Sequence, residues 1–451
     1  MPISRRRIRR LVTLAAAAAL ALGSTGAAAR AASGPPGDQP LPGYTISNPP
    51  LAPVLVHGSP SRVLQGVYEH AAYDLEVPPA WNGKLAVYAH GYAGQGTVLT
   101  VGPPPFGLRQ KLLDEGYAWA ASSYYDNGYD VRAGVTTTHD LARLFARKVG
   151  APRQRLIIGV SMGGHITGRS VEQYPHFYAG ALPMCGVLGD DALFDYYLDY
   201  NLVAQDLSGV RAYPVPADYL TSTVPRIEQA LGLAALTPTG PDTTNALGKQ
   251  FRSIVINRTG GPRPGANAFF AYWKDFPFTL ATPPTGTTLA QDPGQVATNV
   301  FTRYTPNTPM NVNATVQRVP VANLRARLSD ALTQIPHVDG RPGVPVLTLH
   351  TIGDMFVPFS MEQSYAYKVA LHHQSGLVVQ RAVRAAQHCE FSANEAGNAW
   401  DDLVHWIATG KRPAGDNVTD PATLARPDYG CRFTDPTAYT TGTRPLFPPC
   451  S

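Results

Sequence analysis

Apolar runs alternate with helical patterns between residues 66 and 188. The runs "KLAVYAHGYAG", "YAWAASSY", "RLIIGV" and "FYAGALPMCG" predict buried strands, and "VYEHAAYDLEVP" alternates as one more strand. Helical spacing is found in "TTTHDLARLFARKVG", with a threonine or aspartate cap, and in "MGGHITGRSVEQYP". Strands that are apolar throughout and separated by helices are typical of a mostly parallel sheet. The pattern therefore predicts an α/β fold with helices on both faces of the sheet.

The alternation stops near Gly189 and returns at residue 341. Between them lie helix-like pieces, including "DDALFDYYLDYNLVAQDL" and "VANLRARLSDALTQI", separated by Pro-, Thr- and Gly-rich breaks. Afterwards "GVPVLTLH" and "GLVVQRAV" predict strands, and "SMEQSYAYKVALHH" and "NEAGNAWDDLVHWIATG" predict helices. We therefore expect one α/β core in two parts, 66–188 and 341–410, with a mainly helical cap or lid inserted at 189–340.

The first 32 residues have the pattern of a signal peptide. They join the basic stretch "MPISRRRIRR", the apolar stretch "LVTLAAAAALAL" and the small-residue cleavage region "AAARAAS". A helix that spans a membrane needs about 20 apolar residues, so this shorter run predicts export without a stable membrane anchor. Whether the route is Sec or twin-arginine stays open. Residues 33–65 are predicted to form an irregular arm, and residues 411–451 a Pro- and Asp-rich tail.

Composition refines this interpretation. The 451-residue chain is 44% hydrophobic, which is enough for a sizeable core. Its formal net charge is +5, and loss of residues 1–32 would remove six arginines and no acids, leaving −1. The basic character therefore belongs to the signal peptide, and no basic face indicates nucleic acid as a partner. Four cysteines in an exported protein predict two disulfides, with three possible pairings.

A serine stands at the predicted bend between a strand and a helix. The stretch "GVSMG" matches the pattern G-x-S-x-G, with Ser161 at its centre. Such a turn lifts the hydroxyl above the sheet, and the helix N-terminus behind it favours developing negative charge. An ordinary glycine-rich strand–helix turn is the alternative interpretation. The setting between "RLII" and a helical run favours a nucleophile.

A serine nucleophile needs a base, and the base needs an orienting acid. Where G-x-S-x-G carries the nucleophile, the chain order is serine, acid, histidine. Asp354 follows the strand "GVPVLTLH", and His388 lies in the loop after the next strand. We therefore expect Ser161, Asp354 and His388 to meet at one edge of the sheet. Asp190 and Asp191 remain alternatives for the acid.

Other histidines are weaker candidates for the base. His165 lies one helical turn after Ser161, where we expect it to pack beside the site, and His372 and His373 are expected to be solvated at a helix end. Neither H-x-x-x-H nor paired C-x-x-C is present, so no metal or other cofactor is expected.

An acyl-transfer site also needs two backbone donors for the oxyanion. We expect the N–H of Met162, directly after the serine, and the N–H of Tyr92 in "YAHGYAG". The stretch "LVHGS" at 55–59 is similar but lies too early in the chain, before the predicted sheet.

These residues together resemble the α/β-hydrolase superfamily over roughly 66–188 and 343–410. The details are most similar to secreted actinobacterial hydrolases of the esterase/lipase kind. The dipeptide His388–Cys389 also resembles the tannase and feruloyl-esterase group, in which a partner cysteine directly precedes the serine. Val160 occupies that place here, so the likeness is partial.

Cys185 offers another partner for Cys389, because it ends the predicted strand adjacent to the strand that leads into the serine turn. We therefore expect a Cys185–Cys389 disulfide that ties the histidine loop to the sheet. Cys431–Cys450 would then close the tail.

The resemblance implies a secreted serine hydrolase of carboxylic esters, acting on small molecules or polymers through an acyl-enzyme. A peptidase of the prolyl-oligopeptidase kind is the main alternative, although no repeat of propeller-blade length precedes the core. Acyl transfer and non-catalytic binding remain further alternatives. The aromatic stretches 194–201 and 267–278 either line the substrate pocket or pack the cap on the core.

Overall fold

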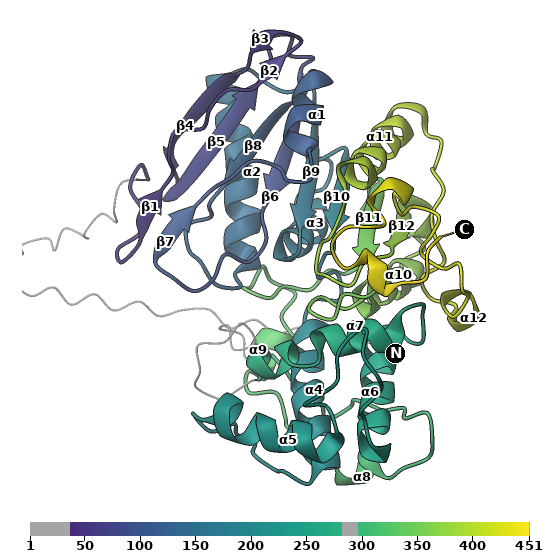
Figure 1. Ribbon diagram of the computed structural model, residues 1–451. Helices are drawn as coiled ribbons and strands as arrows, with labels where there is room; N and C mark the ends of the chain where they lie inside the picture. Colours follow the sequence, from purple (N-terminus) through teal and green to yellow (C-terminus); the bar gives the residue numbers. More distant parts are fainter. Residues whose placement is uncertain (1–36, 282–295, 451) are drawn as a thin grey trace, which may run out of the picture. The chain divides into compact units, whose positions relative to one another are not determined.

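The computed structural model describes residues 37–281 and 296–450 (Figure 1). The predicted signal peptide at 1–32 lies outside them. The main sheet has eight strands in the order β12-β11-β10-β9-β6-β8-β5-β4. The strands are β4 (Arg62–Tyr68), β5 (Ala71–Val77), β6 (Lys84–Ala89), β8 (Ala118–Ser122), β9 (Gln154–Val160), β10 (Gly180–Met184), β11 (Val346–Thr351) and β12 (Val378–Val383). β5 alone runs opposite to the other seven strands, so the sheet is mixed but mainly parallel.

Parallel pairing brings several strand ends to one edge. Ala89 of β6 is in register with Gly159 of β9, and Val160 is in register with Met184 of β10. The chain leaves β9 at Ser161, whose N–H donates to the Met184 carbonyl oxygen at 3.0 Å. The loops that follow β6, β9, β10, β11 and β12 therefore start from the same edge of the sheet, the carboxyl ends of its parallel strands, where open α/β folds have their sites.

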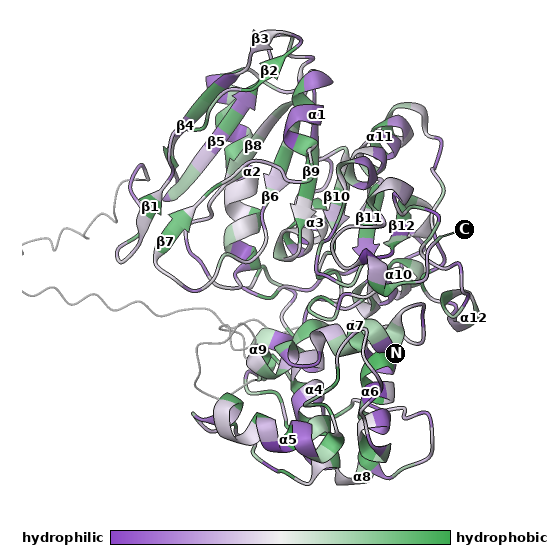
Figure 2. Cartoon of the chain, viewed as in Figure 1, coloured by the Kyte–Doolittle hydropathy of each residue, from purple (hydrophilic) through white to green (hydrophobic). Residues whose placement is uncertain are grey.

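Helices cover both faces of the sheet, as the sequence pattern predicts. Apolar side chains of α1 (Leu108–Asp114) and α11 (Ala393–Thr409) pack in one core cluster with one face. Those of α2 (Val131–Lys148), α3 (Met162–Gln173) and α10 (Ser360–Leu371) pack in another cluster with the opposite face. In Figure 2, β9 and β11 are hydrophobic along much of their length, as expected for strands buried on both sides.

The described part of the segment between β10 and β11 contains helices and no strand, and irregular stretches join the helices. Its longest helices are α4 (Ala192–Ser208) and α6 (Ala246–Arg258), and the shorter ones are α5 (Val224–Leu231), α7 (Ala266–Trp273), α8 (Val312–Thr315) and α9 (Leu324–Arg327). The helix predicted over 321–335 is wrong beyond α9. None of the four residues of α9 is buried, so no apolar face stabilises a longer helix there.

The strand predicted over 67–78 is two strands. Glu69 and His70 have φ values of 49° and 67° and form the turn that joins β4 to β5 in a hairpin. Two successive positive φ angles are what a tight hairpin turn requires. The alternation of apolar and polar residues continues through this turn, so the sequence pattern does not reveal the turn.

The arm predicted as irregular over 33–65 contains pairing strands. These are β1 (Thr45–Ser47), β2 (Leu55–Val56), β3 (Ser59–Pro60) and the start of β4. β1 pairs with β7 (Val98–Thr100), so backbone hydrogen bonds order a stretch that has little apolar periodicity. No helix in the described ranges is long and apolar enough to cross a membrane.

The start of α2 also differs from the prediction. The pattern places the helix start near residue 136, whereas α2 begins at Val131. Asp130 is its N-cap, and the carboxylate accepts from the N–H of Ala133. Side-chain capping of this kind satisfies one of the free donors in the first turn.

Candidate active site

Ser161 occupies a strained turn between β9 and α3. Its φ and ψ are 61° and −121°, a backbone conformation that residues other than glycine rarely adopt. The flanking glycines leave no room for a Cβ atom. One built at Gly159 would lie 1.9 Å from the Gly163 carbonyl oxygen, and one at Gly163 would lie 2.0 Å from the Ala89 oxygen. The G-x-S-x-G spacing therefore follows from close backbone packing around the turn.

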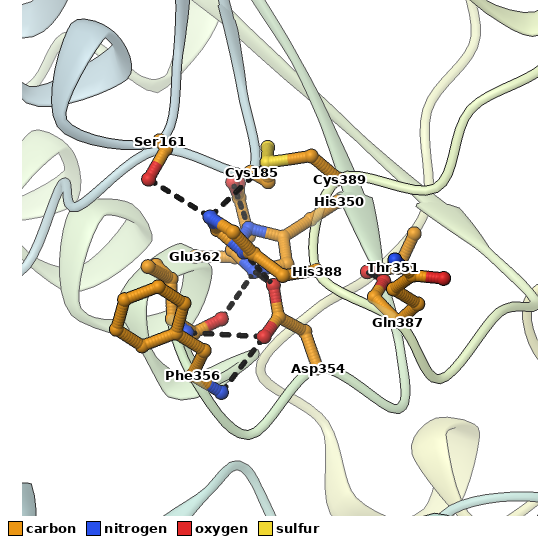
Figure 3. The surroundings of a disulfide bond; sticks show 11 residues. Ser161, Cys185, His350, Thr351, Asp354, Phe356, Glu362, Gln387, His388 and Cys389 are labelled. Carbon is orange, nitrogen blue, oxygen red and sulfur yellow. Dashed lines mark hydrogen bonds and ion pairs between the residues drawn. A yellow bond between two sulfur atoms is a disulfide. The ribbon is translucent and has the colours of Figure 1, made fainter. Parts of the chain in front are cut away.

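The structure brings together the three side chains that the sequence predicts as nucleophile, acid and base (Figure 3). Ser161 Oγ lies 2.8 Å from His388 Nε2, and His388 Nδ1 lies 2.5 Å from Asp354 Oδ2. With Nδ1–H donating to the carboxylate, Nε2 is free to accept the serine proton. The three residues are 227 and 34 positions apart along these two contacts, so only the fold brings them together.

Asp354 is held from both sides. Its side chain is fully buried, whereas that of His388 is 16% exposed. Asp354 Oδ1 accepts from the backbone N–H groups of Phe356 and Val357 at 2.9 and 3.0 Å, which leaves Oδ2 for His388. Such donors stabilise a buried carboxylate and fix its orientation.

The segments that carry the predicted oxyanion donors adjoin the serine. Met162 begins α3, so its N–H is one of the first helical donors without an acceptor within the helix. The loop with Tyr92 passes close by, because a Cβ built at Gly91 would lie 3.1 Å from the Ser161 Cβ. The similar stretch at 55–59 lies on the β2–β3 hairpin, where the His57 ring contacts the Asp114 carbonyl.

Both expected cysteine pairs are joined in the structure. Cys185–Cys389 links the end of β10 to the residue after His388, and Cys431–Cys450 closes part of the tail. Cys185, Cys389 and His388 have metal-ligating atoms within 4.8 Å of one another. The two sulfurs are bonded to each other, however, so they are not available as thiolate ligands.

The alternative acids have other partners. Asp190 lies 2.5 Å from the Lys368 ammonium and accepts from the N–H of Val338. Burial would raise its pKa, but Lys368 lowers the pKa of Asp190 to about 2. Burial and the neighbouring Asp190 charge raise the pKa of Asp191 to about 8, and its cation partner is Arg327.

His165 is a packed core residue, and its backbone N–H, not its ring, contacts the Ser161 carbonyl at 3.4 Å. Its ring is fully buried between the Tyr129 hydroxyl at 3.0 Å and the Pro336 carbonyl at 2.7 Å. Burial lowers the pKa of His165 to about 4, so the ring is neutral at physiological pH. This agrees with the packing role that we expected from its position.

Aromatic residues surround the histidine loop. The Phe356 ring lies 5.0 Å from the His388 ring and 4.8 Å from the Phe276 ring, and both phenylalanines are partly exposed. The Tyr197 hydroxyl donates to the Phe356 carbonyl, and the Trp273 indole N–H donates to the Ala386 carbonyl. The aromatic stretches of the inserted segment thus include packed residues and one residue, Phe276, beside the site.

The tail supports the histidine loop, which the sequence patterns did not indicate. Thr443 Oγ1 accepts from the N–H groups of Ala386 and Gln387 at 2.7 and 2.9 Å, directly before His388. The next residue, Arg444, is buried and binds both carboxylate oxygens of Glu395 at 2.8 and 2.7 Å. A polar stretch without periodicity gives no signal for such contacts.

Two features can be compared with the fold that the sequence resemblance implied: the order of the strands and the position of the serine turn. Eight strands with one reversed strand near an edge, and a strand–serine–helix turn at the centre, match the fold that the sequence resemblance implied. The chain resembles α/β-hydrolases. Its sheet carries the candidate nucleophile, acid and base in the order expected for α/β-hydrolases, Ser161, Asp354 and His388.

Comparison with known proteins finds hydrolases. No protein-family profile matches the chain. It is 35% identical over 78 residues to an o-phthalyl amidase of Xanthobacter agilis, a match that spans 17% of each chain. Similar solved structures include an esterase from Aspergillus oryzae, with 14% identity, coverage of 80% and 82% and a TM-score of 0.48. Feruloyl esterase B from Aspergillus oryzae has 15% identity, coverage of 78% and 81% and a TM-score of 0.45. Pyrococcus horikoshii acylaminoacyl peptidase has 10% identity, coverage of 81% and 44% and a TM-score of 0.39.

Proposed function

We propose that this chain is a serine hydrolase that cleaves carboxylic esters through an acyl-enzyme. The observation that carries the proposal is the hydrogen-bonded series Ser161–His388–Asp354 at the carboxyl edge of the parallel strands. A hydroxyl with an imidazole at 2.8 Å has the geometry required for general-base activation.

The mechanism follows from these contacts. As Ser161 Oγ attacks the acyl carbon, its proton passes to His388 Nε2, and the Asp354 carboxylate stabilises the resulting imidazolium. The backbone N–H groups of Met162 and Tyr92 donate to the oxyanion. His388 then protonates the departing alkoxide, which leaves as the alcohol. In the second half, water gives a proton to His388 and attacks the acyl-enzyme, and Ser161 recovers its proton as the acid is released.

The inserted segment is proposed to act as the cap that sets substrate specificity. Phe276 and Phe356 place aromatic rings beside His388, which favours an aromatic or other apolar acyl group. Both small and polymeric esters contain such groups. Export is proposed from the signal-peptide pattern at 1–32 together with two disulfides, which persist in oxidising compartments.

Amide hydrolysis is the second candidate. The local match to an o-phthalyl amidase favours it, because the acyl-enzyme chemistry is the same and only the leaving group differs. An amine leaves only after it is protonated, so the position of His388 relative to the leaving nitrogen decides between the two substrates.

Labelling with a fluorophosphonate, followed by hydrolysis of an aryl ester and the amide with the same acyl group, tests the proposal. We expect label on Ser161, loss of label and activity in Ser161→Ala, and faster turnover of the ester than of the amide. Ser222→Ala, which changes an exposed serine, is the matched control. Absence of label in the folded wild-type protein would refute the proposed function, and faster amide turnover would replace esterase with amidase.

A further inference from the structure

A second buried hydrogen-bonded group lies behind Asp354. It consists of His350, near the end of β11, and Glu362, in the first turn of α10, and both side chains are fully buried. His350 Nδ1 lies 3.1 Å from Glu362 Oε1, and His350 Nε2 lies 2.8 Å from the Val357 carbonyl oxygen. Figure 3 shows His350 and Glu362 together with Asp354 and His388.

Val357 connects the pair to the triad. Its carbonyl accepts from His350, while its own N–H donates to Asp354 Oδ1 at 3.0 Å. His350 Nε2 also lies 4.0 Å from Asp354 Oδ2, the oxygen that accepts from His388. His350 therefore acts on the triad carboxylate in two ways, through the loop backbone and through space.

The contacts of the pair favour a doubly protonated ring. A carbonyl can only accept, so His350 Nε2 carries a hydrogen. Glu362 Oε2 accepts from Thr348 Oγ1 and Gln380 Nε2, both at 2.6 Å, which stabilises the carboxylate and places its charge opposite Nδ1. Burial alone would lower the pKa of His350, but the hydrogen bond and charge of Glu362 raise it above the usual value.

With a doubly protonated His350, the buried charges around Asp354 and Glu362 balance. Two carboxylates, Asp354 and Glu362, face two cations, His350 and Arg263, whose guanidinium donates to the Ile352 carbonyl. Besides His388, the other titratable groups whose charge acts on Asp354 or Glu362 are tyrosines, and burial raises the pKa of each, which keeps them neutral: Tyr196, Tyr197, Tyr365 and Tyr429.

We propose that His350, held as an imidazolium by Glu362, is a positioning residue that fixes the Asp354 loop and offsets part of the Asp354 charge. The inference rests on the proposed hydrolase function. A cation at this place makes a further positive charge at the site less favourable, so its removal should change the acidic limb of the pH profile. The role is distinct from catalysis, since His350 lies behind the acid and contacts neither Ser161 nor His388 in the described hydrogen bonds.

The test is the pH profile of kcat/KM for a neutral aryl ester. His350→Gln keeps a donor for the Val357 carbonyl but removes the charge. We expect its acidic limb to move to higher pH by about 0.5–1 unit, since removal of a nearby cation makes protonation of the site easier. His350→Phe removes the donor as well and should also lower kcat at the plateau by about tenfold. His373→Gln, an exposed histidine after α10, is the control and should leave the profile unchanged.

A folded His350→Gln variant whose profile superimposes on that of the wild type would overturn the inference. If wild-type protein neither reacts with fluorophosphonate nor hydrolyses esters, the proposed function fails instead. Nitrogen-15 NMR of histidine-labelled wild-type protein provides a second test that needs no variant. One ring should keep both nitrogens protonated at a pH where the exposed histidines are already neutral, and its absence would also overturn the inference.

Discussion

Replacement of Asp354 by asparagine separates the chemistry of the site from its shape. Asparagine has the same size, and its oxygen can still accept from the Phe356 and Val357 N–H groups, now at 2.9 and 3.0 Å from Oδ1. Its NH₂ group would replace Oδ2, 2.5 Å from His388 Nδ1, and would donate where the carboxylate accepts. Nδ1 must then accept, so the ring proton moves to Nε2.

With the proton on Nε2, His388 can no longer accept from Ser161. The equivalent change in a known Ser-His-Asp enzyme lowers kcat about 10⁴-fold, so we expect a loss of about 10³–10⁴-fold here. At 1.36 kcal/mol per factor of ten, this corresponds to about 4–5.5 kcal/mol of transition-state stabilisation. The free energy of unfolding should change by only about 1 kcal/mol, because the backbone hydrogen bonds to the side-chain oxygen persist.

The assay is steady-state hydrolysis of an aryl ester, with thermal unfolding to verify the fold of each variant. Asp190→Asn is the matched control, because Asp190 is the alternative acid and pairs with Lys368. We expect Asp190→Asn to be less stable but to retain its kcat per folded molecule. A folded Asp354→Asn protein within tenfold of wild-type kcat would refute the assignment of Asp354 as the orienting acid.

Three further outcomes are expected. Removing the Cys185–Cys389 disulfide by Cys185→Ser with Cys389→Ser should lower the free energy of unfolding by about 5 kcal/mol, the chain-entropy estimate for a separation of 204 residues. Removing the tail disulfide should lower it by about 3 kcal/mol, and the opposite ranking in denaturant unfolding would contradict this. Gly163→Ala should destabilise by about 3 kcal/mol or more, because its Cβ would meet the Ala89 carbonyl; an unchanged melting temperature would refute this. His165 has a pKa of about 4 in the folded protein against about 6.5 unfolded, so the unfolded state binds the proton first as pH falls. Between pH 7 and 5 the wild type should therefore lose about 2 kcal/mol more stability than His165→Gln, measured by denaturant unfolding.

The arrangement of the candidate triad could be predicted because each member follows an apolar strand. Ser161, Asp354 and His388 come after β9, β11 and β12, and parallel strands share one carboxyl edge. The core strands and the long helices could be predicted as well, because their buried positions are apolar and the spacing of apolar residues can be read in the sequence. The position of His165 in the core could be inferred in the same way.

Other features depend on contacts that leave no periodic signal. The turn at Glu69–His70 interrupts a strand without interrupting its alternation, so only the positive φ angles show it. The apolar spacing at 321–335 suggested a helix that α9 barely begins, because spacing alone does not show whether a partner surface exists. His350 could have been noted as a histidine in a buried strand, but its link to Asp354 depends on the conformation of the loop between them.

The contacts of Thr443 with the backbone before His388 have a consequence for how the protein matures. All three members of the candidate triad are synthesised before this threonine, yet the loop with the base gains two of its hydrogen bonds only from it. A nascent or clipped polypeptide that stops short of residue 443 would hold the complete set of reactive groups with its histidine loosely anchored. Hydrolytic competence would then arise late in biosynthesis, after the distal segment has docked.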